Sequence, residues 1–430
     1  MVGDYSPQNL TLPASLNTLS PMNGLTKEFL EIRSEIEQAL PKLPRPYRLI
    51  EGFCGPGGMS LGLKQAGFKI ERAFDIDGAS IETHNRNLGN HGFVKDAQEV
   101  RGFALMEELE IHRGDLDLFA GGPPCQGFSK QKRGAHLGDS RNDLVKEYIR
   151  IVIELLPRFF FFENVAIFGQ KRGKHYISMM HNAFTDYEIS TYFINSSNFG
   201  LPQTRERFLV VGRRRDVKGA FYFPNRIVSH PTTVGQSLKG LPEPPKDYSV
   251  HPKWANHQQA KVTELNVFRF SHVPQGGGWK DIPKRFQLPC HQRVDTEKGG
   301  WPDVFGRLEW DGLCPTITGG FDSFTRGRYG HPLKNRPLTP REAARIQGFP
   351  DDYVFEGNRG DVRSQIGNAV PPPVAFGVGS YILRSLLVAD GLIKESQPNA
   401  MLCDDIAEYR LTPRIGKIKP SLKYPKRKRA

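Results

Sequence analysis

The sequence predicts an α/β protein with a doubly wound, mostly parallel sheet and a second, smaller, irregular domain. Short apolar runs alternate with helical segments from Tyr47 to Arg215, which is the pattern of strands joined by crossover helices. From Phe221 to Arg336 the sequence is instead rich in Pro, Gly, His and aromatic residues, with few helical periods. The chain of 430 residues also exceeds the length at which a single core usually stops growing, so two domains are expected.

Six apolar runs are expected to form the strands of the first domain. In chain order they are Tyr47–Phe53, Ile70–Phe74, Leu116–Ala120, Phe159–Glu163, Ile189–Ile194 and Phe208–Gly212. Helices are expected over Met59–Ala66 and Asn142–Leu156, after the capping box that begins at Thr339, and over Pro371–Leu387. Because the carboxyl ends of parallel strands meet at one edge, ligands of such sheets bind there.

Composition indicates a reducing compartment and an affinity for polyanions. The five cysteines include no CxxC pair, which argues against a disulfide framework and a structural zinc site. No apolar run approaches the roughly 20 residues that cross a bilayer, and residues 1–41 do not resemble a signal peptide, so we expect a cytoplasmic location and no membrane partner. The net charge is +13, and residues 412–430 hold eight Lys/Arg and no acid. A basic chain attracts polyphosphates, although such tails also serve as solubilising ends.

A glycine-rich turn follows the first predicted strand. The run from Phe53 to Gly58, FCGPGG, lies between this strand and a helix, where glycines let the backbone approach a ligand closely. No GK[ST] follows, so the turn is not a phosphate-binding P-loop. The next strand ends at Asp75, about 20 residues on, where an acid can bond ribose hydroxyls. The two features favour an adenosine-containing cofactor. The alternative is that Asp75 and Asp77 cap the next helix, which for Asp77 is the preferred interpretation.

A cysteine lies on a rigid loop at the end of the third predicted strand. The loop, GGPPCQGFS, runs from Gly121 to Ser129, and its prolines and glycines restrict the backbone. At the carboxyl end of a strand, Cys125 is placed to attack a bound substrate as a nucleophile. The alternative is a buried small hydrophobic residue, which is the usual role of a lone cysteine.

Two polar motifs follow at the same predicted sheet edge. An apolar strand leads into Glu163, and a carboxyl group with apolar neighbours can hold its proton more tightly, which suits a general acid; a helix cap or turn is the alternative. The motif QTRER, from Gln203 to Arg207, precedes the last strand. Alternate residues of an extended chain share a face, so Arg205 and Arg207 can together hold a carbonyl, a carboxylate or a phosphate, unless they form surface ion pairs.

In this order the motifs closely resemble those of the DNA (cytosine-5) methyltransferases, from Tyr47 to Leu387. The matching segments are the glycine turn, the Pro-Pro-Cys-Gln loop, Glu163–Val165, Gln203–Arg207, Arg336–Pro350 and Gln365–Pro371. The resemblance implies a Rossmann-like S-adenosylmethionine-dependent methyltransferase fold. It divides the chain into an N-terminal appendage (1–45), a catalytic and cofactor-binding domain (46–215), a target-recognition domain (216–357), a returning segment that completes the catalytic domain (358–390) and a basic tail (391–430).

The resemblance also implies a role for each site residue. The catalytic residues would be Cys125, Glu163, Arg205 and Arg207. S-adenosylmethionine would be held by Phe53, Gly55, Gly57, Gly58, Asp75, Ile76, Asp96, Pro124, Asn368 and Val370. The DNA would be contacted by Gln126, Ser129, Gln203, Thr316 and Thr318, and no metal site is expected. Asp75 departs from the family, in which this acid is commonly Glu, so its side chain reaches one methylene less far.

The implied mechanism begins with addition of the Cys125 thiolate to C6 of a flipped-out cytosine, which makes C5 nucleophilic enough to take up a methyl group. Glu163 would contact N3 and the exocyclic amine. Arg205 and Arg207 would fix the O2 side of the base and the carboxylate. Loss of the C5 proton and elimination of the thiol would then release 5-methylcytosine.

The expected setting is a monomeric bacterial or archaeal modification enzyme that acts on double-stranded DNA, with a restriction endonuclease for the same site as a further partner. Three alternatives remain open. A transfer RNA methyltransferase would keep the chemistry, although the Cys-Phe-Thr motif of that branch is absent from the sequence. A catalytically silent DNA-binding relative would not need the catalytic residue types, yet every catalytic position of this sequence holds the expected one. A nucleotide-dependent oxidoreductase would leave the cysteine loop and the paired arginines unexplained.

Overall fold

The central element is a seven-stranded, mostly parallel sheet. The computed structural model describes residues 24–124, 144–170, 173–292 and 303–395, and Cys125 lies outside them. Within these ranges the strand order is β3-β2-β1-β4-β5-β8-β6. The bounds are β1 Arg48–Gly52, β2 Lys69–Asp75, β3 Gly92–Val94, β4 Leu118–Gly121, β5 Phe159–Val165, β6 Tyr187–Asn195 and β8 Glu206–Arg214. This architecture confirms the predicted fold class.

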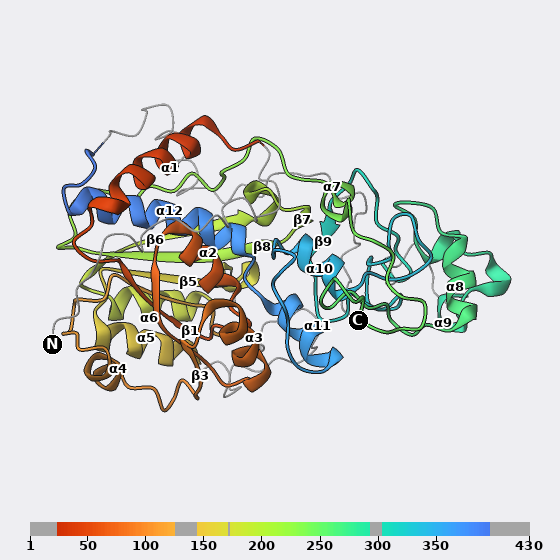
Figure 1. Cartoon of the computed structure of the whole chain (residues 1–430), viewed down its shortest axis with the longest axis horizontal. Coiled ribbons are helices and arrows are strands. Elements are labelled where there is room, and N and C mark those ends of the chain that lie inside the picture. The colour runs from red at the N-terminus through yellow and green to blue at the C-terminus, as the bar shows by residue number, and fades with distance from the viewer. Residues whose placement is uncertain (1–23, 125–143, 171–172, 293–302, 396–430) are drawn as a thin grey trace, which may run out of the picture.

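Helices cover both faces of the sheet, which explains why β5 is a continuous apolar run. Because side chains alternate across a strand, Phe159 and Phe161 enter one core while Phe160 and Phe162 enter the other. Figure 1 shows α1, α2 and α12 on one side of the sheet and α4, α5 and α6 on the other. The bounds of the helices that accompany the sheet are α1 Lys27–Ala39, α2 Gly58–Ala66, α3 Gly78–Leu88, α4 Gly102–Glu108, α5 Leu144–Leu155, α6 Lys174–Ala183 and α12 Pro372–Ala389.

Helix α1 belongs to the first of these cores. The sequence had placed it in an N-terminal appendage, but Phe29 and Ile36 are fully buried. The ring of Phe29 packs edge-on against Phe376 of α12, with 5.7 Å between the ring centroids. Thr26 caps the helix by accepting a hydrogen bond from the Phe29 amide. The described part of the appendage, from residue 24 onward, therefore stabilises the catalytic sheet directly.

One edge of the sheet collects the ends of the strands that carry the predicted motifs. Strands β1 to β5 are parallel, whereas β8 is antiparallel to β5. The carboxyl ends of β1, β2, β4 and β5 therefore meet the amino end of β8, where Val165 pairs with Arg207. Strand β3 had not been predicted, because it spans only three residues and its Val94 is exposed.

The second domain contains few regular elements, as predicted. Its described helices and strand are short: α7 Val234–Leu238, α8 Glu264–Ser271, α9 Pro289–Gln292, β9 Cys314–Pro315 and α10 Pro340–Ile346. Strand β9 pairs in parallel with β7, Gln203–Thr204, which connects the two domains. Helix α10 begins at the predicted capping box: Thr339 Oγ1 accepts from the Glu342 amide and the Glu342 carboxylate accepts from the Thr339 amide.

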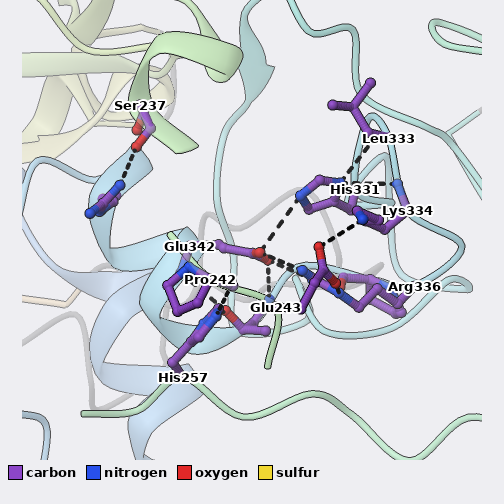
Figure 2. A network of polar contacts seen from close by, with 12 residues as sticks. Ser237, Pro242, Glu243, His257, His331, Leu333, Lys334, Arg336 and Glu342 are labelled. Atoms are coloured by element: carbon purple, nitrogen blue, oxygen red, sulfur yellow. Dashed lines mark hydrogen bonds and ion pairs between the residues drawn. The ribbon is translucent and has the colours of Figure 1, made fainter. Parts of the chain in front are cut away.

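A buried polar network surrounds the start of α10 (Figure 2). Glu342 accepts hydrogen bonds from Arg336 Nη1 and Nη2 at 2.8 and 2.7 Å. His257 lies between Thr339 Oγ1 and the carbonyl of Pro242, at 2.9 and 2.8 Å. The network fixes the loop before α10 and the segment around His257 to the same helix terminus, and so substitutes for the regular structure that this domain lacks.

The chain then returns to the sheet through α11, Arg359–Asn368, and α12. Together these helices span Arg359–Ala389, which is long and apolar enough to cross a membrane, but 83% of the apolar window is buried inside the protein. Ile382 and Leu386 of α12 belong to the same core as Phe159. The apolarity of α12 is thus accounted for by its packing on the sheet and on α2.

Candidate active site

The glycine turn after β1 has the conformation that its residues predict. Gly55 and Gly57 have φ values of 51° and 91°, and Phe53 also has a positive φ of 56°. The Asp75 carboxylate at the end of β2 accepts a hydrogen bond from the Gly55 amide at 2.9 Å. Positive φ is costly for a residue with a Cβ, so the bond from Asp75 and the packing of Phe53 on Phe74 hold a strained turn in place.

The turn leaves one of its glycines beside open space. A Cβ built on Gly55 would meet no atom within 4 Å, whereas one on Gly58 would lie 2.3 Å from the Val370 carbonyl oxygen. Gly58 is therefore required for close approach of the returning segment, and Gly55 borders open space. Ile76, directly after β2, is 69% exposed and offers an apolar surface beside the turn.

The three acids near the turn accept hydrogen bonds from nearby residues of the protein, which the sequence did not predict. Asp75 also accepts from the Asp77 amide at 3.0 Å, and burial raises the pKa of its carboxyl group. Asp77 lies at the N-cap position of α3, as predicted, but its side chain accepts from Ser80 Oγ and not from a backbone amide. Asp96 is half-buried and accepts from the Gln98 amide at 2.9 Å.

The other predicted cofactor residues lie on the returning segment and beside the cysteine loop. Asn368 is exposed at the end of α11 and bonds Ser364 Oγ at 3.2 Å. Val370 is half-buried and contacts the glycine turn through its carbonyl oxygen. Pro124 is exposed at the last described position before the cysteine loop. Cys125, Gln126 and Ser129 lie outside the described residues.

The segment that leads into Cys125 packs directly against the Glu163 motif. Asn164 Nδ2 donates a hydrogen bond to the Pro123 carbonyl at 3.0 Å. A Cβ built on Gly122 would lie 3.3 Å from Glu163 Oε2 and 3.9 Å from a methyl group of Val370. Sequence reasoning had given Asn164 no partner and Gly122 no role. The structure shows that these two residues bring three motifs to one place.

Glu163 and Arg207 form an ion pair at this edge of the sheet. Arg207 Nε lies 2.8 Å from Glu163 Oε1, and the two side chains are 11% and 10% exposed. Burial lowers the pKa of Arg207, while Glu163 acts in the opposite direction. The expected carboxyl group with only apolar neighbours is therefore replaced by a carboxylate with one guanidinium partner. The expectation that Arg207 would fix this carboxylate agrees with the geometry.

Arg205 and Gln203 face into the protein. Arg205 is 2% exposed, and its two terminal nitrogens donate to the carbonyls of Ile317, Gly367 and Ala369. Gln203 is fully buried, donates to Gln347 Oε1 at 2.8 Å and accepts from the Ile317 amide at 2.7 Å. Arg205 Nε is buried without a partner among the described residues, while the other side-chain polar atoms of both residues have partners within the protein. These partners lie more than a hundred residues away in the sequence, and the roles expected for Arg205 and Gln203 toward the base stay predictions.

The two threonines expected to contact DNA are half-buried beside Arg205. Thr316 Oγ1 donates to the Thr204 carbonyl at 2.9 Å, and Thr318 Oγ1 bonds the Tyr329 hydroxyl at 3.2 Å. Both hydroxyl groups thus have partners within the protein. They hold the 314–318 segment against β7, and their expected contact with DNA stays a prediction.

The described cysteines differ in environment. Cys54 and Cys314 are buried, and burial raises the pKa of both thiols, which makes them poor nucleophiles. Cys290 is exposed on α9. Sequence reasoning also missed Glu51, a fully buried acid in β1 that accepts from Ser60 Oγ at the start of α2. Burial raises the pKa of Glu51 to about 8, and a lone acid within an apolar strand was the available signal.

Comparison with known proteins places the chain in a family. A model of the C-5 cytosine-specific DNA methylases matches residues 47–384. The chain therefore belongs to this family and is a DNA cytosine methyltransferase. Membership of the family implies that S-adenosylmethionine is the methyl donor.

Relatives and solved structures agree with this placement. Type II methyltransferase M.PspPI of Psychrobacter sp. (strain TA137) is 33% identical over 350 residues, which cover 80% of this chain and 81% of that protein. Type II methyltransferase M.XorII of Xanthomonas oryzae pv. oryzae is 32% identical over 387 residues, with 82% and 87% covered. A prophage-encoded DNA modification methyltransferase (E. coli) aligns with a TM-score of 0.58 at 28% identity, covering 80% of this chain and 99% of its own. EhMeth of Entamoeba histolytica shares the fold: it aligns with a TM-score of 0.53 at 17% identity, covering 79% of this chain and 98% of its own.

Proposed function

We propose that this chain is the modification enzyme of a restriction–modification system and methylates C5 of one cytosine within a specific double-stranded DNA sequence. The relatives that it matches over four fifths of its length are named as Type II methyltransferases. A partner endonuclease would cut the same sequence when it is unmethylated. The enzyme would act in the cytoplasm as a monomer.

One observation carries the proposed chemistry: the Glu163–Arg207 pair lies against the segment that leads into Cys125. The Pro123 carbonyl is bonded to Asn164, the residue after Glu163, so the start of the cysteine loop is fixed to the acid motif. A nucleophile and an acid that act on one base must lie within reach of it at the same time. The geometry supports a single pocket formed by the ends of β4, β5 and β8.

In the proposed mechanism the thiolate of Cys125 adds to C6 of cytosine, and the ring becomes enamine-like at C5. Glu163 contacts N3 and the exocyclic amine and stabilises the developing charge, while Arg207 orients Glu163 through its ion pair. S-adenosylmethionine, when bound, supplies an electrophilic methyl group. Once C5 carries the methyl group, a water molecule takes up the C5 proton, the C–H electron pair forms the C5–C6 double bond and the C6–S bond breaks, which restores aromaticity and the free thiolate.

The described residues that would hold the cofactor are the glycine turn, Asp75, Ile76, Asp96, Pro124, Asn368 and Val370. The open space beside Gly55 and the exposed side chain of Ile76 fit the sugar and base of an adenosine group. Because the reacting atoms of cytosine are inaccessible inside a stacked duplex, the base must leave the helix, at a cost of a few kcal/mol. Residues of the second domain would hold the opened DNA.

Methyl transfer to DNA tests the proposal. The purified protein is incubated with radiolabelled S-adenosylmethionine and a mixture of unmethylated DNA, and converted cytosines are mapped by sequencing. We expect 5-methylcytosine at one short recurring sequence and at least a 10³-fold loss of transfer in Cys125→Ala. The matched control is Cys290→Ala, which alters an exposed cysteine on α9 and should retain activity.

Other outcomes would redirect the proposal. Transfer to RNA without transfer to DNA would indicate the RNA substrate, and binding without transfer would indicate a silent DNA-binding relative. Full activity of Cys125→Ala would refute the role of this thiol.

A further inference from the structure

Arg205 is a buried cation whose partners are backbone carbonyls from distant parts of the chain. Nη1 donates to the carbonyls of Ile317 and Gly367 at 3.0 and 3.1 Å, and Nη2 donates to that of Ala369 at 3.1 Å. The residue is 2% exposed. Burying a charge is costly unless hydrogen bonds compensate it, so a side chain in this position requires a reason.

The carbonyls of Gly367 and Ala369 explain how the charge is accommodated. They belong to the penultimate residue of α11 and to its C-cap, where helix carbonyls lack intrahelical donors and the helix dipole is negative. Asn368 lies between the two acceptors. The guanidinium group therefore closes the end of α11 and fixes the backbone that leads to Val370, whose carbonyl oxygen contacts Gly58 of the glycine turn.

The third acceptor lies in the second domain. Ile317 stands between Thr316 and Thr318, and its amide is bonded to Gln203 Oε1 at 2.7 Å. The backbone of Arg205 itself is held at the end of β6, since its carbonyl accepts from Ser196 N at 3.0 Å. Two residues further along, Arg207 forms the ion pair with Glu163.

From these contacts we infer that Arg205 is a positioning residue that couples cofactor binding to DNA binding. This inference rests on the proposed function. Its guanidinium group bonds the backbone of Gly367 and Ala369, which leads to the proposed cofactor site, and also the backbone of Ile317 in the second domain. Arg205 itself lies next to the strand that carries Arg207. When the cofactor orders Gly367–Ala369, the backbone at Ile317 is therefore ordered as well, and the reverse holds when DNA binds. Binding of either ligand thus lowers the free-energy cost of binding the other.

Arg307 provides a matched comparison inside the second domain. It is 5% exposed and donates to the carbonyls of Phe270, Val273, His331 and Lys334. All of these acceptors lie between residues 270 and 334, and none belongs to the returning segment. A substitution of Arg307 thus removes an equally buried guanidinium group without touching the proposed connection.

The test measures the affinity for S-adenosylhomocysteine with and without DNA in the wild type, Arg205→Lys and Arg307→Lys. The DNA is a duplex selected from a random-sequence pool by binding to the wild type, so that the measurement needs no turnover. Lysine keeps the charge but not the planar fork. We expect DNA to raise the wild-type affinity at least about 5-fold, the ratio to fall to about 1 in Arg205→Lys, and Arg307→Lys to keep the wild-type ratio.

Retention of the wild-type ratio in Arg205→Lys, an equal loss in Arg307→Lys, or no coupling in the wild type would each overturn the inference. Methyl transfer by a wild type that shows no coupling would leave the proposed function intact. Thermal unfolding monitors whether each variant is folded.

A second measurement uses the wild type alone, in case Arg205→Lys does not fold. S-adenosylhomocysteine without DNA should slow amide hydrogen exchange at residues 314–318, which lie in the second domain. Unchanged exchange there, with slowed exchange in the glycine turn, would overturn the inference.

Discussion

Two buried acid–arginine pairs in this protein have similar exposure but different surroundings. Glu342 accepts two hydrogen bonds from Arg336 and one from the Thr339 amide, so both of its oxygens are occupied. Glu163, at the sheet edge, forms an ion pair with Arg207 through Oε1. Its second oxygen lies against Gly122, beside the segment that leads into Cys125.

The difference separates a structural pair from one that can serve a ligand. A carboxylate with every oxygen satisfied lowers the energy of the fold but has no capacity left for a substrate. A carboxyl group oriented by a single guanidinium group can contact a base through its other oxygen, accepting a proton as the carboxylate or donating one as the acid. The partners of an acid are thus more informative about its role than its burial.

The largest expected effect is on catalysis through Glu163. Glu163→Gln keeps the shape of the side chain but removes the charge and the proton-transfer capacity, so methyl transfer should fall by about 10²- to 10⁴-fold. Single-turnover rates with saturating DNA and cofactor measure this loss. A rate within 3-fold of the wild type would show that the pair at the sheet edge is structural, like its counterpart.

The second effect is on stability through Glu342. Glu342→Gln removes the nearer counter-ion of Arg336, leaves it only Glu243 at 3.7 Å, and weakens the capping box of α10, so the free energy of unfolding should fall by about 3 kcal/mol. Urea unfolding of the two variants compares them directly. A larger loss in the free energy of unfolding for Glu163→Gln than for Glu342→Gln would contradict the comparison.

The third effect is a pH dependence through His331, which lies 3.7 Å from Glu342 (Figure 2). Burial lowers the pKa of His331 to about 4, although Glu342 opposes the shift, and its Nδ1 accepts from the amides of Leu333 and Lys334. Because the unfolded chain takes up this proton at a higher pH than the folded one, stability should fall as the pH drops from about 6.5 to about 4.

His331→Asn removes this titration while keeping an acceptor for the two amides. Between pH 6.5 and 4 the variant should lose about 3 kcal/mol less stability than the wild type, as measured by urea unfolding at several pH values. His84, whose pKa burial also lowers to about 4, is present in both proteins and cancels in the difference. Parallel stability profiles would contradict the assignment.

Local patterns allowed much of the fold to be predicted from the sequence. The four phenylalanines of β5 predicted an apolar strand, and Thr339 with Glu342 predicted the start of α10, because each pattern depends on neighbours in the chain. Helix α1 was placed outside the core, because nothing in its own sequence identifies Phe376 as its partner.

The candidate site divides in the same way. Glu163 and Arg207 were predicted from motifs, and the structure brings them together. The partners of Gln203 and Arg205 could not be predicted, because Gln347 and Gly367 are distant in sequence and their contacts depend on how the returning segment folds back. Residue type alone indicates that an arginine binds an acceptor, but it does not distinguish a base from a backbone carbonyl.

The most direct test of the central claim is a covalent trap at Cys125. In DNA with 5-fluorocytosine at the target position, fluorine replaces the C5 proton that must leave, so the C6–S bond cannot break after methylation. The account predicts a protein–DNA adduct that survives denaturation, requires S-adenosylmethionine and maps to the peptide containing Cys125. The absence of an adduct from an enzyme that methylates ordinary DNA, or attachment at another residue, would contradict it.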